Sequence, residues 1–221
     1  MKAQGMELTD LGLLVATGTL HLVFENVFGA KGPFLVVAGA LWLLWIVRRR
    51  RQDPMLLTSW GMSRRKLGSG CLAACALTLP AAGLLLLLGR LSGHRVSVHA
   101  AAVVILYLPW ALVQQVALQG ILLRGLERLL PPAAAVVGAA LPFSGAHLPD
   151  LKLCALTFAG AVGWTVLFRL RRTVWPLVLS HAVLGTLTYI AVLGRDPWPD
   201  VLRAVSAISA FVGLSPPPGA P

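Results

Sequence analysis

The chain has 221 residues, of which 57% are hydrophobic and only 12% are charged. A soluble domain has about twice that share of charged residues, and apolar runs such as 34–47 and 151–170 leave too little polar sequence to cover a soluble surface. A mean hydropathy of +0.79, spread along the chain, also excludes disorder and a soluble domain with a single anchor. The composition therefore predicts a polytopic membrane protein.

Apolar segments of membrane-spanning length follow one another along the chain. A helix needs about 20 apolar residues to cross a bilayer. This length predicts seven helices, at residues 11–28, 33–47, 71–88, 97–123, 133–148, 151–170 and 176–194. The second and the fifth are short for a span. The last apolar stretch, 201–214, is also short and precedes a proline-rich end, so it is predicted to be interfacial or a marginal eighth helix. The predicted fold is an all-α bundle of about seven, or eight, transmembrane helices.

The chain is expected to divide into three parts. Residues 1–95 would form N-terminal membrane helices with a cytoplasmic basic loop at 48–66. Residues 96–195 would form a core that holds most of the polar side chains inside the membrane. Residues 196–221 would form the interfacial or marginal helix and a proline-rich tail.

The net charge of +11 does not indicate a nucleic-acid partner, because the basic residues lie in the gaps between apolar segments. Assigning these gaps alternately to the two sides of the membrane gives 13 Lys and Arg residues on the N-terminal side and six on the other. Since Lys and Arg are retained on the cytoplasmic side, we expect a multi-pass protein of the cell membrane with a cytoplasmic N-terminus. The segment 55–67 mixes apolar and basic residues, which predicts either an interfacial segment or an ordinary loop.

Polar side chains inside the predicted spans are few. They are His21 and Glu25 in the first helix, Gln114, Gln115 and Gln119 in the fourth, Ser144 and His147 in the fifth, and Ser180 and His181 in the seventh. Polar groups are costly in hydrocarbon, so they mark either helix–helix hydrogen bonds or a functional site. The glutamines alone are explained by bridging between helices. The additional histidines favour a site, and Pro142 is typical of a kink that opens a polar pocket.

The order of these motifs resembles the CAAX protease and bacteriocin-processing family, also called CPBP or Abi. The family pattern is Glu-Glu-x-x-x-Arg-Gly, then Phe-x-x-x-His, then His-x-x-x-Asn, and the corresponding stretches here begin at Gln114, Phe143 and His181. The resemblance makes 96–195 a CPBP-like core. It implies an intramembrane endopeptidase in which a Glu activates water, while two His and an Asn assist and stabilise the oxyanion.

The sequence departs from the family pattern at the first motif and at the end of the third. Gln114 and Gln115 occupy the two Glu positions, Gln119 occupies the Arg position, and Gly185 occupies the Asn position. A carboxamide can orient water by hydrogen bonding, but it has no basic site that takes a proton. If the chain cleaves peptides, its base must therefore come from elsewhere.

Glu25, one helical turn from His21, is a candidate for the missing carboxylate, because an acid in a membrane helix usually has a functional partner. Simple contact with the membrane interface is the alternative interpretation. The candidate catalytic positions are therefore His147, His181, Gln114 and Gln115, the supporting ones are Gln119, Phe143 and Gly185, and the further candidates are Glu25 and His21.

Three functions remain open from the sequence. The chain is predicted to be a CPBP-type endopeptidase, or a divergent homologue, that acts on membrane-associated protein tails, or else a catalytically inactive binding or immunity protein with this fold. A small transporter is a third alternative, which the lack of an internal repeat disfavours. The expected partners are the lipid bilayer and a membrane-embedded or lipidated protein, and not a nucleic acid. His147 and His181 alone make an incomplete zinc site, so no cofactor is predicted, and a bound metal stays an open alternative.

Overall fold

The computed structural model describes residues 8–64 and 66–211, and helices dominate these residues. Along the chain they are α1 (Leu8–Asn26), α2 (Lys31–Gln52), α3 (Pro54–Ser59), α4 (Leu67–Leu91), α5 (Ala100–Gln115), the π-helix η1 (Val116–Leu123), α6 (Arg124–Leu126), α7 (Pro132–Gly145), α8 (Leu151–Arg171), α9 (Trp175–Leu187), the π-helix η2 (Thr188–Val192) and α10 (Trp198–Phe211). These described residues contain no β-strand, so the all-α prediction is confirmed. Lys2, Arg65 and 212–221, on which sequence expectations also rested, lie outside the described residues.

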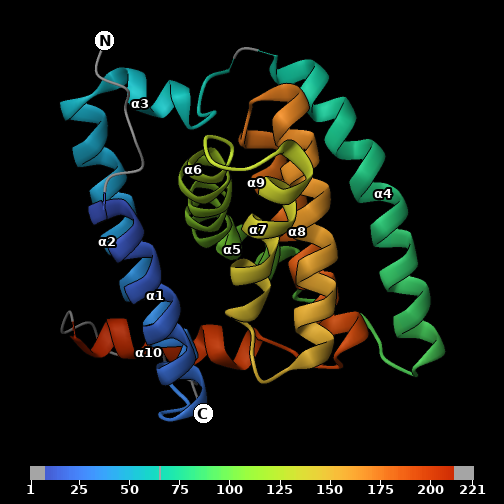
Figure 1. The fold of residues 1–221 in the computed structure, drawn as a ribbon. Coiled ribbons are helices and arrows are strands. Elements are labelled where there is room, and N and C mark those ends of the chain that lie inside the picture. The colour runs from blue at the N-terminus through green and yellow to red at the C-terminus, as the bar shows by residue number, and fades with distance from the viewer. Residues whose placement is uncertain (1–7, 65, 212–221) are drawn as a thin grey trace.

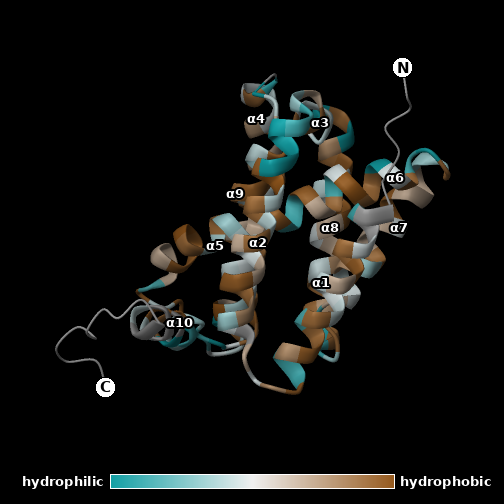
Figure 2. Cartoon of the chain, turned by 90° about the vertical axis from the view of Figure 1, so that its left-hand side faces the viewer, coloured by the Kyte–Doolittle hydropathy of each residue, from teal (hydrophilic) through white to brown (hydrophobic). Residues whose placement is uncertain are grey.

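Five segments of the described chain are long and apolar enough to cross a membrane, so the protein is multi-pass. They are Gly32–Gln52, Leu67–Leu91, Ala100–Leu126, Leu151–Arg171 and Trp175–Val192. The first and fifth expected helices correspond to α1 and to the shorter apolar helix α7. Figure 2 shows hydrophobic residues along the sides of the bundle and hydrophilic residues mainly near its two ends. That distribution is the one a bilayer requires.

The helix α2 extends further than its apolar residues indicate. It continues to Gln52, so Arg48–Arg51 lie in its last turns instead of in the expected loop. Arg is a good helix former, and basic side chains are favourable at the C-terminal end of a helix. Asp53 then accepts backbone N–H groups from the first turn of α3 and so caps this short helix within the segment 55–67.

The arginine-rich parts of the chain meet at one end of the bundle. The segment between α3 and α4 contacts the start of α9, where the Val174 N–H donates to the Gly61 carbonyl oxygen at 2.9 Å. Glu127, just after α6, accepts hydrogen bonds from Arg169 and Arg172 at the end of α8, both shorter than 3 Å. These direct contacts thus bring together segments that carry several of the described basic residues assigned by the sequence to the N-terminal side.

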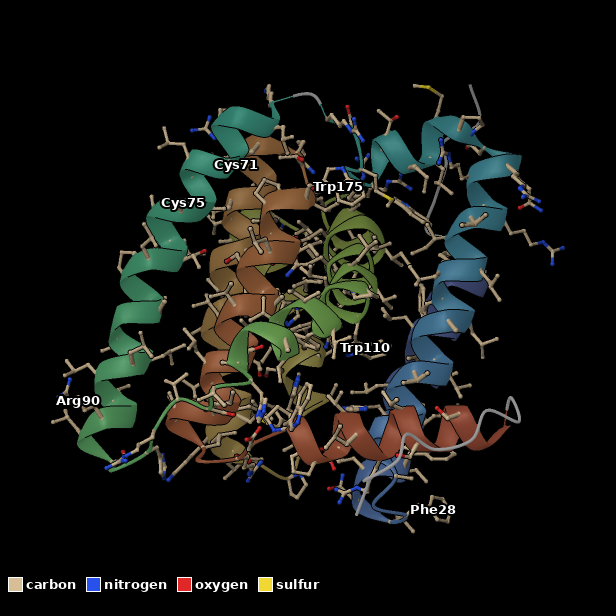
Figure 3. The ribbon with its side chains drawn as sticks, turned by 180° about the vertical axis from the view of Figure 1, so that it is seen from behind. Phe28, Cys71, Cys75, Arg90, Trp110 and Trp175 are labelled. Atoms are coloured by element: carbon tan, nitrogen blue, oxygen red, sulfur yellow. The ribbon has the colours of Figure 1, made fainter. Side chains whose placement is uncertain are left out.

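The other end of the bundle is crossed by α10, which lies across the bundle helices and not alongside them (Figure 1). Phe28 and Arg90 lie at this end, and Trp175 lies at the opposite one (Figure 3). With 14 residues, α10 is about 21 Å long, which is shorter than the roughly 30 Å hydrocarbon core. The Trp198 ring stacks on His99, with centroids 4.6 Å apart, and joins α10 to the start of α5. We therefore interpret α10 as the interfacial helix.

Small residues allow the helices around the site to pack closely. A Cβ added to Gly89 of α4 would lie 2.6 Å from the Ala191 carbonyl oxygen of η2, and one added to Gly70 would lie 2.6 Å from Thr173 Cγ2. Where α7 packs on α8, fully buried alanines such as Ala139 line the contact. Lipid provides no hydrophobic force between helices, so such close van der Waals contacts stabilise the bundle.

Candidate active site

The helix that carries the first motif changes its hydrogen-bonding pattern within the motif. The α-helix α5 ends at Gln115 and continues directly as the π-helix η1, which contains Gln119. π-helices are rare and occur frequently at functional sites. Both glutamines are 0% exposed, and Gln119 Nε2 donates to Gln115 Oε1 at 3.3 Å. The two side chains share a face, as expected from their spacing of four residues, whereas the π-helix itself was not predicted.

Gln114, Gln115 and His181 are joined by a hydrogen-bond chain through Tyr107. Gln115 Nε2, which can only donate, lies 3.3 Å from His181 Nδ1, so a neutral His181 carries its proton on Nε2. Nε2 lies 3.4 Å from the Tyr107 hydroxyl oxygen, and that hydroxyl donates to Gln114 Oε1 at 2.7 Å. Both ring nitrogens of His181 are therefore engaged, and we call these four residues with Gln119 the glutamine cluster.

Aromatic rings cover the glutamine cluster. The ring centroids of Tyr107, Phe143 and Trp164 lie 5.6, 5.8 and 4.4 Å from that of His181. Trp164 is fixed in turn, because its Nε1 donates to Ser180 Oγ at 2.9 Å. Only 3% of His181 is exposed. A peptide reaches this histidine only if the surrounding rings move.

The position of the family's Asn is filled from another helix. Gly185 lies one turn after His181 on α9, and a Cβ added to it would lie 3.0 Å from Tyr107 Cε1. An Asn side chain at this position would displace the tyrosine ring. Tyr107 thus provides the hydrogen-bond partner of His181 in the space that a longer side chain at 185 would need.

The second motif connects the glutamine cluster to a more accessible histidine. α7 ends at Gly145, so His147 lies in the turn after the helix, where it is half-buried. Its Nδ1 is 3.1 Å from the Phe143 carbonyl oxygen, which can only accept, so a neutral His147 has its lone pair on Nε2. The Phe143 ring centroid is 5.9 Å from that of His147 and 5.8 Å from that of His181. Phe143 therefore contacts both histidines.

His147 lines an open groove of about 560 Å³ at the end of the bundle away from the arginine-rich segments. The groove is formed by the end of α1, the turn after α7, the first turn of α8 and one residue after η2. Its lining residues are Glu25, Asn26, His147, Leu148, Pro149, Asp150, Leu151, Lys152, Leu153 and Arg195. Asn26 Nδ2 donates to the Leu148 carbonyl oxygen at 3.2 Å, which fixes α1 beside the turn after α7.

His21 and Glu25 of α1 lie beside His147. Glu25 Oε2 is 3.1 Å from His21 Nε2. The His21 ring centroid is 6.5 Å from that of His147, with the rings nearly perpendicular. The Glu25 side chain is 28% exposed and lines the groove, whereas the His21 side chain is 11% exposed. The structure thus brings the two further candidates next to a motif histidine from another helix.

Asp150 is the other carboxylate of the groove. Its Oδ1 accepts the Leu153 N–H at 3.0 Å as the N-cap of α8, and its Oδ2 lies 2.8 Å from Arg195 Nη2. The hydrogen bond from the Leu153 N–H, and then the charge of Arg195, hold the pKa of Asp150 below its ordinary value. Asp150 is therefore a weak base.

The sequence candidates fall into two groups. One group surrounds His181 and contains Gln114, Gln115, Gln119, His181 and Gly185. The other lies at or beside the groove and contains His147, Glu25 and His21, with Phe143 between the two groups. Sequence reasoning missed Tyr107, Trp164 and also Thr165, whose hydroxyl lies 3.5 Å from Gln119 Nε2. Tyr107 lies two turns before Gln114 on the same helix face, a signal that could have identified it. Residues 8–64 and 66–211 contain no group of three or more His, Cys, Asp or Glu placed to hold a metal.

A comparison with protein-family models gives a match over part of the chain. Residues 96–187 match the family model described as Type II CAAX prenyl endopeptidase Rce1-like. The matched residues include the stretches that begin at Gln114, Phe143 and His181. Searches of curated proteins and of solved structures gave no match. Residues 96–187 are therefore similar to the CPBP family, in agreement with the three motifs.

Proposed function

We propose that this chain is a divergent CPBP-type membrane protein that binds the tail of another membrane-associated protein, and that its first motif does not activate water. The observation that carries the proposal is the neutral hydrogen-bond chain from Gln115 through His181 and Tyr107 to Gln114, at the positions where the family has two carboxylates. A carboxamide takes no proton from water. The glutamine cluster therefore lacks the carboxylate base of the family reaction.

The groove beside His147 has the chemistry for holding a protein tail. Its volume of about 560 Å³ falls within the range of ligand pockets. Lys152 lines the groove and has no ion-pair partner among the described residues. Its ammonium group would attract the carboxylate at the end of a tail. A lipid anchor on the same tail would remain in the bilayer beside the apolar helices.

The binding test uses the purified chain in lipid vesicles and fluorescent peptides with an acyl or prenyl anchor and a free C-terminal carboxylate. We expect saturable binding that Lys152→Glu weakens several-fold, because the reversal replaces an attraction of up to about 1 kcal/mol by a repulsion. Amidating the peptide should reproduce the loss. Arg203→Glu is the matched control, because Arg203 lies on α10, outside the residues that line the groove, and pairs with Asp200. If none of these peptides binds, the proposal is wrong.

We also propose that the arginine-rich end faces the cytoplasm, which would put the groove at the opposite face of the cell membrane. The test places a single cysteine at Arg50 in a chain whose three native cysteines are changed to Ser. A membrane-impermeant thiol reagent should label it in inverted vesicles and not in intact cells. Labelling in intact cells would contradict this orientation.

A further inference from the structure

We propose that four arginines at the arginine-rich end of the bundle form a binding site for the phosphate group of an anionic phospholipid. They are Arg124, Arg128, Arg169 and Arg172, and we call them the arginine cluster. The site lies at the opposite end of the bundle from the groove (Figure 1). The inference therefore goes beyond the proposed function and does not depend on it.

The arginine cluster carries more positive charge than the protein neutralises. Glu127 Oε1 accepts from Arg169 Nε at 2.9 Å, and the two Glu127 oxygens accept from Arg172 at 2.8 and 3.0 Å. Within residues 8–64 and 66–211, no other carboxylate forms an ion pair with the four arginines. One carboxylate is thus shared among four guanidinium groups.

The fold holds these like charges close together. Arg124 donates to the Ser59 carbonyl oxygen at the end of α3, and the charges of Arg128 and Arg172 repel that of Arg124. The Arg172 Cζ atom lies 5.6 Å from the centroid of the Phe168 ring, a cation–π contact that keeps Arg172 in place. Like charges held together in this way raise the free energy of the cluster, and a bound anion would lower it.

The geometry of the guanidinium group favours a phosphate as that anion. Each guanidinium is planar and can donate two parallel hydrogen bonds to the oxygens of one phosphate. Arg128 and Arg172 are both exposed, and Arg128 has no ion-pair partner in the part of the chain that the structure describes. An anion can therefore reach these two arginines without a movement of the helices.

Exposed apolar side chains beside the arginine cluster indicate that the phosphate belongs to a lipid. Leu129, directly after Arg128, is 76% exposed, and Leu170, directly after Arg169, is 61% exposed. Both lie where a membrane-spanning segment ends, the level at which headgroups meet acyl chains. A soluble phosphate would contact the arginines alone, whereas a phospholipid would also cover the leucines with its acyl chains.

The excess charge also selects among phospholipids. The ammonium group of a zwitterionic headgroup would be repelled by the arginines that Glu127 does not neutralise. The headgroup of phosphatidylglycerol carries the phosphate charge without an ammonium group. An anionic phospholipid is therefore the ligand that fits both the charge and the apolar border of the site.

The test titrates the purified full chain, in micelles of a neutral detergent, with phosphatidylglycerol, and native mass spectrometry counts the bound lipids. We expect one lipid to bind more tightly than the others, and phosphatidylcholine to bind at that site at least about fivefold more weakly. Arg128→Gln should weaken the tight binding about fivefold, the usual contribution of one basic residue near an anionic lipid. Glu127→Gln should strengthen it, because the change frees the guanidinium groups of Arg169 and Arg172.

Two matched arginines distinguish a site from general surface charge. Arg50→Gln removes an exposed arginine of α2 at the same end, outside the arginine cluster. Arg90→Gln removes an exposed arginine at the opposite end (Figure 3). Each should change the binding less than about twofold, because separated exposed charges are screened. Thermal unfolding verifies that each variant folds.

The outcomes that overturn the inference are distinct. Equal losses in Arg128→Gln and Arg50→Gln would show a diffuse charge effect, and weaker binding by Glu127→Gln would show that the cluster does not attract the lipid through its charge. Glycerol phosphate, a headgroup without acyl chains, should not displace the lipid at the same concentration. If it does, the anion alone is the ligand and the assignment to a lipid is wrong. None of these results depends on whether a protein tail binds in the groove.

Discussion

Charged substitutions at Gln115 and Gln119 test the contact between these two buried side chains. Both side chains are 0% exposed, and an unpaired charge in such a position costs about 3–5 kcal/mol. We therefore expect Gln115→Glu and Gln119→Arg each to lower the free energy of unfolding by this amount. The side chains are in contact at 3.3 Å, so the two new charges would lie within about 4 Å, where their attraction at an effective dielectric constant of 20 is about 4 kcal/mol.

The double variant should therefore lose less stability than the two single variants together. The four proteins form a double-mutant cycle. Fitting the longer Arg beside Thr165 costs about 1–3 kcal/mol in both the single and the double variant, so this cost cancels when the coupling energy is calculated. We expect a coupling of about 2–4 kcal/mol, measured by denaturant unfolding in mixed micelles. The control cycle combines Gln114→Glu with Gln119→Arg and should give a smaller coupling, because Gln114 contacts Tyr107 instead. Additivity within about 0.5 kcal/mol at 115 and 119 would refute the contact.

Three further predictions concern the bundle. Gly89→Ala should lower the free energy of unfolding by about 1–3 kcal/mol, because the added Cβ would meet the backbone of η2. Gly83→Ala on the same helix is the control, because its Cβ would meet nothing within 4 Å and should not lower the stability. Equal effects of the two variants would contradict the packing. Ser180→Ala removes the acceptor of the Trp164 indole N–H and should cost about 1 kcal/mol by the same measurement. Burial raises the pKa of Glu127, but hydrogen bonds and charges from two arginines outweigh it, so the net pKa is lowered. The ionised Glu127 carboxylate therefore stabilises the fold above the ordinary pKa of Glu, and this stabilisation is lost as the pH falls through the lowered pKa. Glu127→Gln should therefore reduce the dependence of the free energy of unfolding on pH in the acidic range.

The spans could be predicted from the sequence because apolar length is a direct requirement of the bilayer. The helix ends were less certain. Arg48–Arg51 are not apolar, yet they continue α2 because helix propensity and the helix dipole favour arginine there. The π-helix η1 had no signal, since its sequence is as apolar and as helix-compatible as that of α5. A hydropathy pattern does not distinguish hydrogen bonds to i−4 from those to i−5.

The site was predicted in part. The motif order placed Gln115 and His181 in the same candidate site, and the two side chains are 3.3 Å apart across 66 residues of chain. It gave no indication that Tyr107 would occupy the space next to Gly185, because that contact depends on how closely α5 and α9 approach. The proximity of Glu25 to His147 likewise depends on the packing of α1 against the end of α7. No spacing within one helix encodes a contact between two helices more than a hundred residues apart.

The two groups of candidate residues differ in what a charge costs there. In the covered glutamine cluster, carboxylates are compatible with folding only if a cation accompanies them, so the absence of an Arg at 119 and the absence of acids at 114 and 115 are physically linked. The Glu25 side chain is 28% exposed and contacts His21, so its charge is partly solvated. A carboxylate at the groove therefore costs little, and it is positioned beside the histidine that a bound tail can reach. This difference explains why a neutral first motif and an ionisable residue on α1 are compatible within one fold.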